Sequence, residues 1–449
     1  MTTDDINGNV EFVDSIGIKT KNIFMSKFKN ITISQEEEEE EESPTERHNL
    51  IKWWNQEKLK NAKVMVVGAG AIGNETLKNL ALLGIGNIFL ADFDTISTSN
   101  LSRTVLFRKT DVGKRKSEVA AMRTKEMSIY DDVKVNWFHG DVVWELGTGV
   151  YREMDIVLGC LDNVETRMAV NKHCWLTNTP WIDSGTQELG LRVEFYLPPN
   201  LPCYQCSLTV EQLINANKRY SCDQFKRKSF EEGKIPTTQI ASAIVSAIQV
   251  QEAIKHLVGQ KVLVGKRIYY QGFCNDFDVI SMNVKDDCFA HANYPDDKII
   301  SLPIRSDILL KDFLQIVSQE QHSKEGATLD FRGDRTFVKS INCRVCNKSI
   351  KLMKPSFRIY SDETVCNECE SGNQQNEIPN TEAEVPKITQ EQFSLDNCEQ
   401  EMLNMTLRDL GVPYLHIVAV YDKDENYKYY ELSGDKEILF PIKKKWVVN

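Results

Sequence analysis

The sequence of 449 residues has no long apolar run. No stretch approaches the roughly 18 consecutive apolar residues that a membrane-spanning helix needs, so no membrane association is expected. The first residues, MTTDDINGN, lack the basic start and the apolar segment of a secretory signal peptide. Together, these two absences predict a cytoplasmic protein.

The sequence also has no excess of positive charge. It holds 54 lysines and arginines against 65 acidic residues, for a net charge of −11. A chain without a large basic surface is not expected to bind nucleic acid. Much of the acidity lies in residues 1–50, which include a run of glutamates over 36–42. Because like charges repel and cannot build a core, residues 1–45 are predicted to form an acidic, largely disordered arm.

Glycine and proline are not enriched, and no internal repeat is visible. With 23 glycines and 13 prolines, the chain is neither collagen-like nor of low complexity. Hydrophobic residues make up 41% of the chain and charged residues 27%, which is typical of a soluble globular protein. The length suggests about three domains.

Cysteine, by contrast, is plentiful, with 12 residues. In the reducing cytoplasm, cysteines spaced as C-x-x-C are metal ligands or reactive thiols more often than disulfides. Two such pairs, Cys343 with Cys346 and Cys366 with Cys369, have the spacing of a zinc ribbon. Four ligands leave no open coordination position, so this Zn²⁺ is predicted to be structural.

Short apolar runs alternate with helical patterns from residue 63 onward, which predicts βαβ units on a parallel sheet. The expected parallel strands are 63–67, 87–91, 133–138, 155–159 and 180–183. Later strands, expected at 192–197, 267–273 and 278–284, have no helix between the last two. They predict an antiparallel extension of the sheet. The segment 236–257 is apolar on nearly every face, as a buried helix would be.

The alternating pattern breaks near residue 298, and this break divides the chain into an arm (1–45), an α/β domain (46–297) and a C-terminal part (298–449). The C-terminal part carries the zinc ribbon and the polar linker 371–387, and it closes with strand-like runs at 414–421 and 427–432. The expected fold is therefore a Rossmann-like, mostly parallel sheet with an antiparallel extension, followed by a smaller β-rich domain that we expect to be β-grasp-like.

A glycine-rich turn follows the first predicted strand and opens a helix. It contains Gly68, Gly70 and Gly73, and Asp92 lies at the end of the next strand. Glycines allow the backbone to approach a phosphate closely, a helix N-terminus attracts the anion, and the acidic residue suits a ribose hydroxyl. This turn predicts a nucleotide site, but alone it describes a nicotinamide dehydrogenase equally well.

Two further segments narrow the choice of nucleotide. DFDTISTSNLSRTVLFRKTDVGKRK (92–116) and CLDNVETRMAVNKHC (160–174) closely resemble elements of the ThiF/MoeB and ubiquitin-activating enzyme superfamily. The resemblance covers most of 46–297 and implies an adenylation domain that uses MgATP. It also implies that Asp92 binds ribose, which gives the acidic residue after the glycine-rich turn its role.

The same resemblance implies the remaining nucleotide ligands. Asn100, Arg103 and Lys116 would hold the ATP phosphates, with Arg103 and Lys116 as catalytic cations, and Asp162 would coordinate Mg²⁺. The chemistry agrees, because attack on the α-phosphate needs cations near phosphorus and a hard oxygen ligand suits Mg²⁺. Arg47 matches one arginine of a family pattern, and whether it reaches ATP is left open.

A second zinc site is implied by the resemblance. Cys203 and Cys206 match half of a structural zinc site of the family, and Cys288 with His291 stands where the other half is expected. Imidazole replaces thiolate as a zinc ligand without difficulty, so a Cys₃His site is chemically sound.

One cysteine is a candidate nucleophile. Cys222 lies in the polar crossover segment, about 207–236, where thioester-forming members of the superfamily carry their catalytic cysteine. Nearby lysines and arginines would favour its thiolate. An ordinary loop cysteine is the alternative. Cys160 and Cys174 are expected in the core.

The sequence therefore predicts a compact activating enzyme for a ubiquitin-like protein. It would adenylate the C-terminal glycine of a small β-grasp modifier, form a thioester on Cys222 and pass the modifier to a conjugating-enzyme-type carrier. The resemblance implies a homodimer, and single-chain enzymes of this compact type occur in bacterial ubiquitin-like conjugation systems. The alternatives are a sulfur-carrier adenylyltransferase that needs no thioester, a non-catalytic scaffold, and a dehydrogenase.

Overall fold

The computed structural model describes residues 43–213, 236–295, 298–321, 326–332, 335–370, 386–422 and 426–441. The chain divides into two units, residues 1–46 and residues 47–449, and every strand of the described ranges belongs to the second. Within these ranges, none of the helices combines the length and the apolar character that crossing a membrane would require.

The second unit is built on an eight-stranded sheet with the order β3-β2-β1-β4-β5-β6-β7-β8. The parallel strands are β1 (Lys63–Val67), β2 (Asn87–Ala91), β3 (Lys134–Phe138), β4 (Ile156–Gly159) and β5 (Trp181–Gln187). The antiparallel strands are β6 (Gly190–Tyr196), β7 (Lys266–Gln271) and β8 (Asp276–Ser281). The mostly parallel sheet with an antiparallel extension is confirmed, and the expected strand positions hold to within a few residues.

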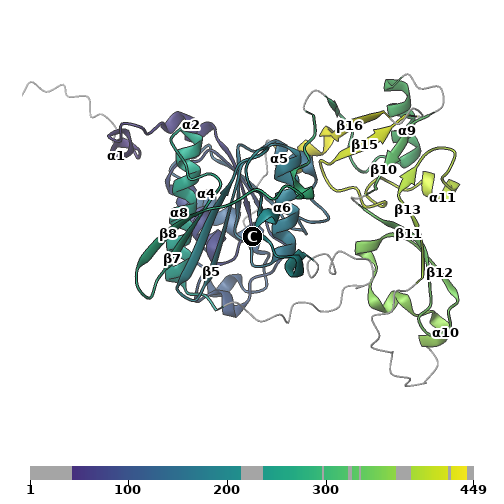
Figure 1. The fold of residues 1–449 in the computed structure, drawn as a ribbon, viewed down its shortest axis with the longest axis horizontal. Helices are drawn as coiled ribbons and strands as arrows, with labels where there is room; N and C mark the ends of the chain where they lie inside the picture. The colour runs from purple at the N-terminus through teal and green to yellow at the C-terminus, as the bar shows by residue number, and fades with distance from the viewer. Residues whose placement is uncertain are drawn as a thin grey trace, which may run out of the picture. The chain divides into compact units, whose positions relative to one another are not determined.

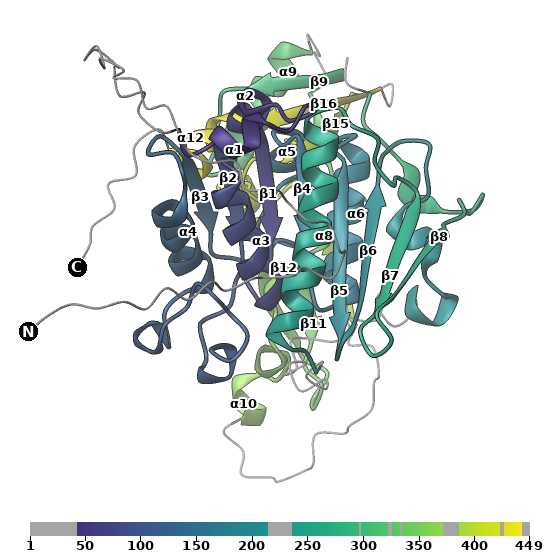
Figure 2. The same ribbon diagram turned by 90° about the vertical axis from the view of Figure 1, so that its left-hand side faces the viewer.

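Helices cover both faces of the parallel strands, as a parallel sheet requires. One face packs against α2 (Gln56–Asn61), α3 (Ala71–Leu82), α4 (Lys116–Met127) and α8 (Gln239–Leu257). The other packs against α5 (Thr148–Arg152) and α6 (Val164–Leu176). Figure 1 shows α2, α4 and α8 on one side of the strands and α5 and α6 on the other, and Figure 2 shows α3, α4 and α8 in front of the sheet.

Alternation along β1 explains the two layers. Val64 and Val66 lie in the core beneath α3 and α8, whereas Met65 and Val67 lie in the core beneath α5 and α6. Both sets are buried because successive side chains of a strand point to opposite faces. The near-continuous apolar run KVMVV is therefore what a central parallel strand requires.

Helix α8 is buried as expected, but its buried face is partly polar. The Gln249 amide donates to the carbonyl oxygens of Gly159 and Ile182, at 3.0 and 2.9 Å, and Ser246 lies 3.1 Å from the Thr76 hydroxyl. These contacts satisfy polar atoms that burial would otherwise leave without partners. They tie α8 to the sheet and to α3.

The C-terminal part contains a five-stranded sheet with the order β14-β10-β15-β16-β9. Its strands are β9 (Ile299–Leu302), β10 (Thr328–Asp330), β14 (Gln392–Phe393), β15 (Ile417–Tyr421) and β16 (Tyr427–Leu432). Helix α9 (Leu310–Glu320) packs Phe313 and Leu314 against one face of this sheet, in a core with Val418 and Val420. We call this unit the C-terminal β-sheet. The expectation of an additional β-rich domain is confirmed.

A smaller three-stranded sheet carries the predicted zinc ribbon. It consists of β11 (Phe337–Asn342), β12 (Ser349–Pro355) and β13 (Lys387–Gln390), with β11 in the centre. Strand β13 begins at Lys387, the last residue of the predicted linker, and 371–385 lies outside the described ranges. The remaining α-helices of the described ranges are short: α1 (Glu46–Asn49), α10 (Asn367–Glu370), α11 (Gln400–Leu403) and α12 (Lys436–Leu439).

Residues of the C-terminal part belong to the core of the large sheet. Leu415 and Leu439 are buried in the same core as Met65 and Phe89, on the side of α5 and α6. The ring of Phe440 lies 5.2 Å from that of Phe89. The C-terminal part thus supplies cover for the face of the parallel sheet near β2.

Candidate functional site

The glycine-rich turn is shaped by two close backbone approaches. Gly68 has φ +99°, and a Cβ there would lie 2.4 Å from the carbonyl oxygen of Cys160. A Cβ at Gly73 would lie 2.0 Å from the carbonyl oxygen of Gly68. Only glycine fits at these positions. Gly70 caps the N-terminus of α3 with open space beside it, so the turn presents a helix N-terminus that suits a phosphate.

Asp92 connects this turn to the end of β2. Its carboxylate accepts hydrogen bonds from the backbone N–H of Ala69, at 2.7 Å, and from that of Asp94, at 2.8 Å. Burial raises the pKa of Asp92, and the nearby charge of Lys116 opposes that rise. Each carboxylate oxygen keeps a second lone pair, so the group can still accept a ribose hydroxyl.

The predicted phosphate ligands follow β2 and are held by their neighbours. Asn100 ends the 3₁₀ helix η1 (Thr98–Asn100), where its side-chain oxygen accepts the N–H of Ser97 at 2.9 Å. Arg103 donates from Nη1 to the carbonyl oxygen of Ser99 at 2.6 Å. Each side chain has further N–H groups, so both can still donate to an anion.

Lys116 is the first residue of α4 and is buried. Its Nζ lies 2.7 Å from the Asp94 carboxylate, and its backbone N–H donates to the Asp94 carbonyl oxygen. An ammonium group has three donors, so this pairing orients the lysine without exhausting it. The ion pair keeps a buried cation close to Asp92.

Asp162 follows β4 and is exposed. The amide of Asn163 donates to one of its oxygens at 3.1 Å, while the Asn163 side-chain oxygen caps α6 by accepting the N–H of Thr166. Strand β1 lies between β2 and β4, and the helices that follow β1 and β4 cover opposite faces of the sheet. Ligands of open α/β sheets bind at such a topological switch point, at the carboxyl ends of the strands. The glycine turn, Asp92 and Asp162 all stand at that edge.

Arg167 supports the Asp162 loop, and the sequence analysis assigned it no role. Its Nε lies 2.8 and 3.0 Å from the two oxygens of Asp183, and its Nη2 donates to the carbonyl oxygen of Leu161 at 2.5 Å. Arg167 and Asp183 are both buried. The signal that could have found Arg167 is its place in the element CLDNVETRMAVNKHC, five residues after Asp162.

The first metal cluster joins the predicted ligands Cys203, Cys206, Cys288 and His291, whose ligand atoms all lie within 4.8 Å of one another. The Cys203 sulfur is 3.7 Å from that of Cys206 and 3.6 Å from that of Cys288, and the Cys206 sulfur is 3.3 Å from His291 Nε2. Sulfurs at the corners of a tetrahedron around Zn²⁺ are separated by about 3.8 Å. The cluster could therefore hold zinc.

The second cluster joins Cys343, Cys346, Cys366 and Cys369, again within 4.8 Å. The Cys366 sulfur lies 3.5 Å from both Cys346 and Cys369, and the backbone N–H of Cys366 points at the Cys343 sulfur. This set could also hold zinc. Both clusters lie far along the chain from the glycine turn, and each offers four ligands, which suits a structural ion.

The remaining cysteines divide by burial. Cys160 and Cys174 are buried as expected, and burial raises the pKa of Cys160 to about 12 and that of Cys174 well above its ordinary value. Neither is a nucleophile in this state. Cys222 and the crossover residues 214–235 lie outside the described residues. Arg47 is exposed in α1.

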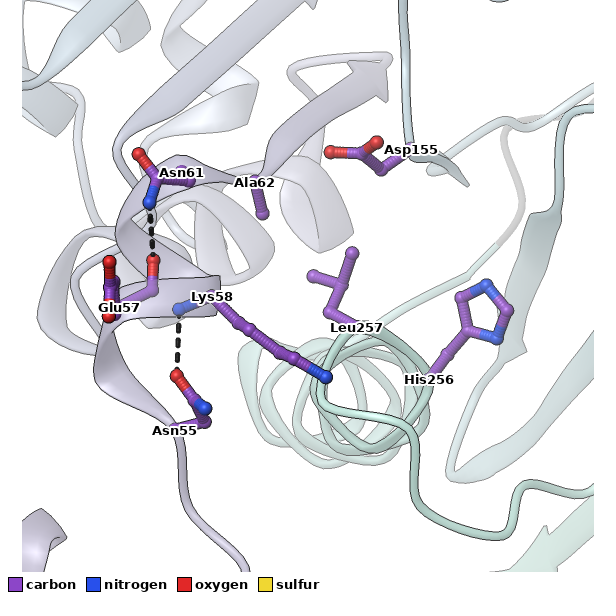
Figure 3. A pocket seen from close by; sticks show the side chains of 8 residues that line it. All are labelled: Asn55, Glu57, Lys58, Asn61, Ala62, Asp155, His256 and Leu257. Carbon is purple, nitrogen blue, oxygen red and sulfur yellow. Dashed lines mark hydrogen bonds between the residues drawn. The ribbon is translucent and has the colours of Figure 1, made fainter.

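A hollow of about 710 Å³ lies at the opposite edge of the sheet, near the amino ends of β1 and β4 (Figure 3). Its lining residues are Asn55, Glu57, Lys58, Asn61, Ala62, Asp155, His256 and Leu257. The Asn55 and Asn61 side chains are already engaged in hydrogen bonds within α2 and its N-cap. Since nucleotides bind at the carboxyl ends of parallel strands, this hollow is not the nucleotide site.

Comparison with known proteins points to one family. The sequence model described as "ThiF family" matches residues 45–294. SUMO-activating enzyme subunit 2 of Dictyostelium discoideum is 38% identical over 151 residues, which cover 33% of this chain and 22% of that protein. Ubiquitin-like modifier-activating enzyme 5 of the same organism is 33% identical over 220 residues, covering 45% of this chain and 55% of that protein.

A third relative matches a longer stretch. Adenylyltransferase and sulfurtransferase MOCS3 of Dictyostelium discoideum is 27% identical over 298 residues, covering 66% of this chain and 64% of that protein. The chain thus spans less than two thirds of each of these relatives. A crystal structure of E. coli MccB with AMPCPP and MccA is 25% identical, covers 56% of this chain and 75% of that one, and has a TM-score of 0.47. That similarity is too low to carry an argument.

Proposed function

This chain belongs to the ThiF family, and from that premise we propose that it is an ATP-dependent activating enzyme for a ubiquitin-like protein. It adenylates the C-terminal glycine of a small β-grasp modifier, takes the modifier onto Cys222 as a thioester and transfers it to the cysteine of a conjugating-enzyme-type carrier. The active form is a homodimer, which light scattering of the purified protein would test.

One observation carries the proposal. The glycine turn after β1, the acidic Asp92 after β2 and the exposed Asp162 after β4 share the carboxyl edge of the sheet, where the strand order reverses. Lys116 adds a buried cation beside Asp92. This set offers several cationic groups for phosphates and a carboxylate for a metal ion. It therefore suits a nucleoside triphosphate with its divalent ion better than it suits a nicotinamide dinucleotide.

In the adenylation step, a carboxylate oxygen of the modifier attacks the α-phosphorus of ATP. The bond between that phosphorus and the bridging oxygen breaks, and pyrophosphate leaves with the bridging oxygen. Arg103 and Lys116 donate hydrogen bonds to phosphate oxygens and offset the charge that builds on them. Asp162 would hold Mg²⁺, which when bound would supply further positive charge. Asp92 fixes the ribose and so aligns the α-phosphate.

In the thioester step, the Cys222 thiolate attacks the acyl carbon of the adenylate, and AMP leaves. Residues Lys218, Arg219, Lys226, Arg227 and Lys228 stand close to it in the sequence and favour the thiolate. The carrier's thiolate then attacks the same acyl carbon, and Cys222 leaves. No proton donor or redox partner is needed in either exchange.

Pyrophosphate exchange tests the adenylation step. The full-length protein, MgATP and a panel of ubiquitin-like proteins ending in glycine should incorporate labelled pyrophosphate into ATP only when the correct modifier is present. Asp162→Ala should lower the exchange rate by about 100-fold or more, since a group that stabilises transition-state charge is lost. The matched control is Asp131→Ala, an exposed aspartate in the loop after α4. Exchange that is unaffected by Asp162→Ala contradicts the assignment.

Gel electrophoresis with and without reductant tests the thioester step. A reductant-labile adduct between chain and modifier should form in the wild type and be absent in Cys222→Ala. Cys274→Ala is the control, because Cys274 is an exposed cysteine that forms no disulfide and belongs to neither metal-ligand cluster. An adduct that survives Cys222→Ala overturns the role of this cysteine.

The second candidate function is a sulfur-carrier adenylyltransferase. One relative, which matches this chain over 298 residues, is named an adenylyltransferase and sulfurtransferase. This function requires adenylation alone. Modifier-dependent exchange without any reductant-labile adduct would favour it over the first proposal.

A further inference from the structure

The segment from Phe138 to Gly149 touches both the candidate nucleotide site and the C-terminal β-sheet. At its start, the carbonyl oxygen of Phe138 accepts the backbone N–H of Asp92 at 3.1 Å. At its end, the N–H of Gly147 donates to the carbonyl oxygen of Tyr414 at 2.8 Å, and that of Gly149 donates to Leu415 at 2.9 Å. One short segment therefore bonds to residues that are more than 300 positions apart in the chain.

Tyr414 is held on both sides by this segment. Its N–H donates to the carbonyl oxygen of Glu145 at 3.2 Å while its own carbonyl oxygen accepts from Gly147, and Leu146 pairs with it in a parallel bridge. Backbone hydrogen bonds in both directions fix the position of the residue. These bonds therefore fix the Tyr414 side chain beside the end of β3.

The Tyr414 ring connects directly to Phe138. The two rings meet edge to face, with centroids 6.0 Å apart and an angle of 78° between their planes. The guanidinium of Arg408 lies 3.4 Å from the centroid of the Tyr414 ring, so the ring is packed between a cation and a second aromatic ring. Such contacts contribute about 0.5–1.5 kcal/mol each beyond the area they bury. The ring contact fixes the position of Phe138, whose carbonyl oxygen accepts the backbone N–H of Asp92.

Two glycines make this close approach possible. A Cβ at Gly147 would lie 2.4 Å from the carbonyl oxygen of Tyr414, and a Cβ at Gly149 would lie 2.6 Å from that of Leu415. Any other residue would force the segment and the C-terminal β-sheet apart. The sequence is therefore suited to this contact at both positions.

A second contact fixes the same segment. Arg335 is buried and donates from Nη1 to the carbonyl oxygens of Trp144 and Gly411, at 3.2 and 2.9 Å. Trp144 stacks on Phe357, with ring centroids 4.7 Å apart and planes within 6° of parallel. The segment is thus bound to the C-terminal part through its middle as well as its end.

We propose that Tyr414 is a positioning residue for the nucleotide: it fixes Phe138 and, through that carbonyl, the backbone of Asp92. The C-terminal part of the chain thereby contributes to ATP affinity through a residue that lies just before β15. This inference rests on the proposed function, because it takes the nucleotide to be ATP and Asp92 to be its ribose ligand.

Calorimetric titration of the full-length protein with MgATP tests the inference. Tyr414→Leu keeps the backbone bonds and removes the ring. It should raise the Kd for MgATP about 5- to 20-fold, which is the lower part of the range usual for coupling between distant sites. Tyr414→Phe keeps both ring contacts and should bind like the wild type. Tyr427→Leu is the matched control, since Tyr427 is a tyrosine of the C-terminal part that begins β16 and contacts Asp330 and Tyr421 instead.

Steady-state exchange gives a signature that a merely structural role would not produce. In Tyr414→Leu, the KM for ATP should rise while the KM for the modifier and the kcat stay close to those of the wild type, because the variant loosens only the nucleotide's ligand. An equal loss in kcat and in both KM values would indicate general misfolding and would overturn the positioning role.

Hydrogen exchange on the wild-type protein provides a test that does not depend on any variant folding. Binding of MgATP should slow exchange at the amides of Gly147 and Gly149, whose acceptors are Tyr414 and Leu415. Unchanged exchange at both amides, or a Tyr414→Leu variant with wild-type affinity, overturns the inference alone. A wild-type protein that binds no MgATP overturns the proposed function, and the inference falls with it.

Discussion

Asp92 both stabilises and destabilises the fold: its hydrogen bonds stabilise it, and the burial of its charge destabilises it. Its carboxylate joins the glycine turn to the end of β2 through two backbone hydrogen bonds, yet it lies in a half-buried position where loss of solvent disfavours its charge. The result is a raised pKa, caused first by burial and reduced by Lys116 and the two backbone donors.

The sign of the pH dependence follows from that raised pKa. Between the ordinary value of 3.8 and the higher folded-state value, the native protein binds more protons at Asp92 than the unfolded chain does. The free energy of unfolding therefore falls as pH rises through this window. Asp92→Asn cannot titrate, so the unfolding free energy of the variant minus that of the wild type should increase from pH 4 upward and then level off.

Urea unfolding of both proteins at several pH values measures this difference. Hydrogen bonds lost in Asp92→Asn shift the difference by a constant amount and leave its slope unchanged. A difference that decreases with rising pH would mean that Lys116 and the backbone donors outweigh burial.

The buried pair of Arg167 and Asp183 gives a second prediction at this scale. Asp183→Ala leaves a buried guanidinium without its carboxylate, which should lower the free energy of unfolding by about 3–5 kcal/mol. Urea unfolding checks this, with Asp131→Ala expected within about 0.5 kcal/mol of the wild type. A loss below about 1 kcal/mol would show that the carbonyl oxygens of Leu161 and Ser184 suffice for Arg167.

The residues that sequence could assign are those whose role depends on local pattern. The glycine turn and Asp92 could be predicted as a nucleotide site because such a turn needs glycines at fixed spacing after a strand. Arg167 and Tyr414 were not assigned, since their roles come from partners distant in the chain or in another layer. The Tyr414 contact joins positions separated by more than 260 residues. Cys222 stays a prediction.

At the scale of elements, the two cysteine clusters should stabilise different parts of the fold. Cys203 and Cys206 are buried in the core that also holds Trp181 and Tyr196, whereas the cluster around Cys366 belongs to the small three-stranded sheet. Loss of a structural zinc removes the binding energy that orders its ligand loops. Loss of zinc from the cluster with Cys203 should therefore destabilise the large sheet. Loss of zinc from the cluster with Cys366 should destabilise only the small three-stranded sheet.

Metal analysis of the full-length protein tests this difference. The wild type should hold about two Zn²⁺ per chain, and Cys203→Ser and Cys366→Ser should each hold about one. Cys203→Ser should also lower the midpoint of thermal unfolding of the large sheet and weaken MgATP binding, while Cys366→Ser should leave MgATP binding unchanged. A zinc content that Cys366→Ser leaves at the wild-type value would show that the second cluster is not a zinc site.

The central elements of the large sheet could be predicted because β1, β2 and β4 are buried on both faces and are apolar along most of their length. The sequence also predicted a domain boundary near residue 298, which stays a prediction. It did not indicate that Leu415, Leu439 and Phe440 would pack against the first sheet, because an apolar residue in a pattern does not identify which core it enters. The polar side of α8 was missed for a related reason, since the acceptors of Gln249 are carbonyl oxygens on other strands.

In the second unit as a whole, the α/β domain and the C-terminal part share a core, and we therefore expect them to unfold cooperatively. Strands β1 and β2 and the residues Leu415 and Leu439 bury their apolar surface together, so unfolding of either part exposes apolar surface of the other. Domains that are joined by small polar contacts open independently, whereas parts that share a core open together. Ligand binding at one part should then stabilise the other.

Native-state hydrogen exchange with and without MgATP measures this linkage. At a ligand concentration of about 100 times the Kd, binding adds about 2.7 kcal/mol to the stability of every segment that unfolds with the site. The amides of Val64 to Val66 in β1 and those of Val418 to Val420 in β15 should gain equal protection, although only β1 adjoins the glycine turn. Protection gained in β1 alone would mean that the C-terminal β-sheet unfolds independently, and the contacts at Leu415 and Leu439 would then contribute packing without cooperativity.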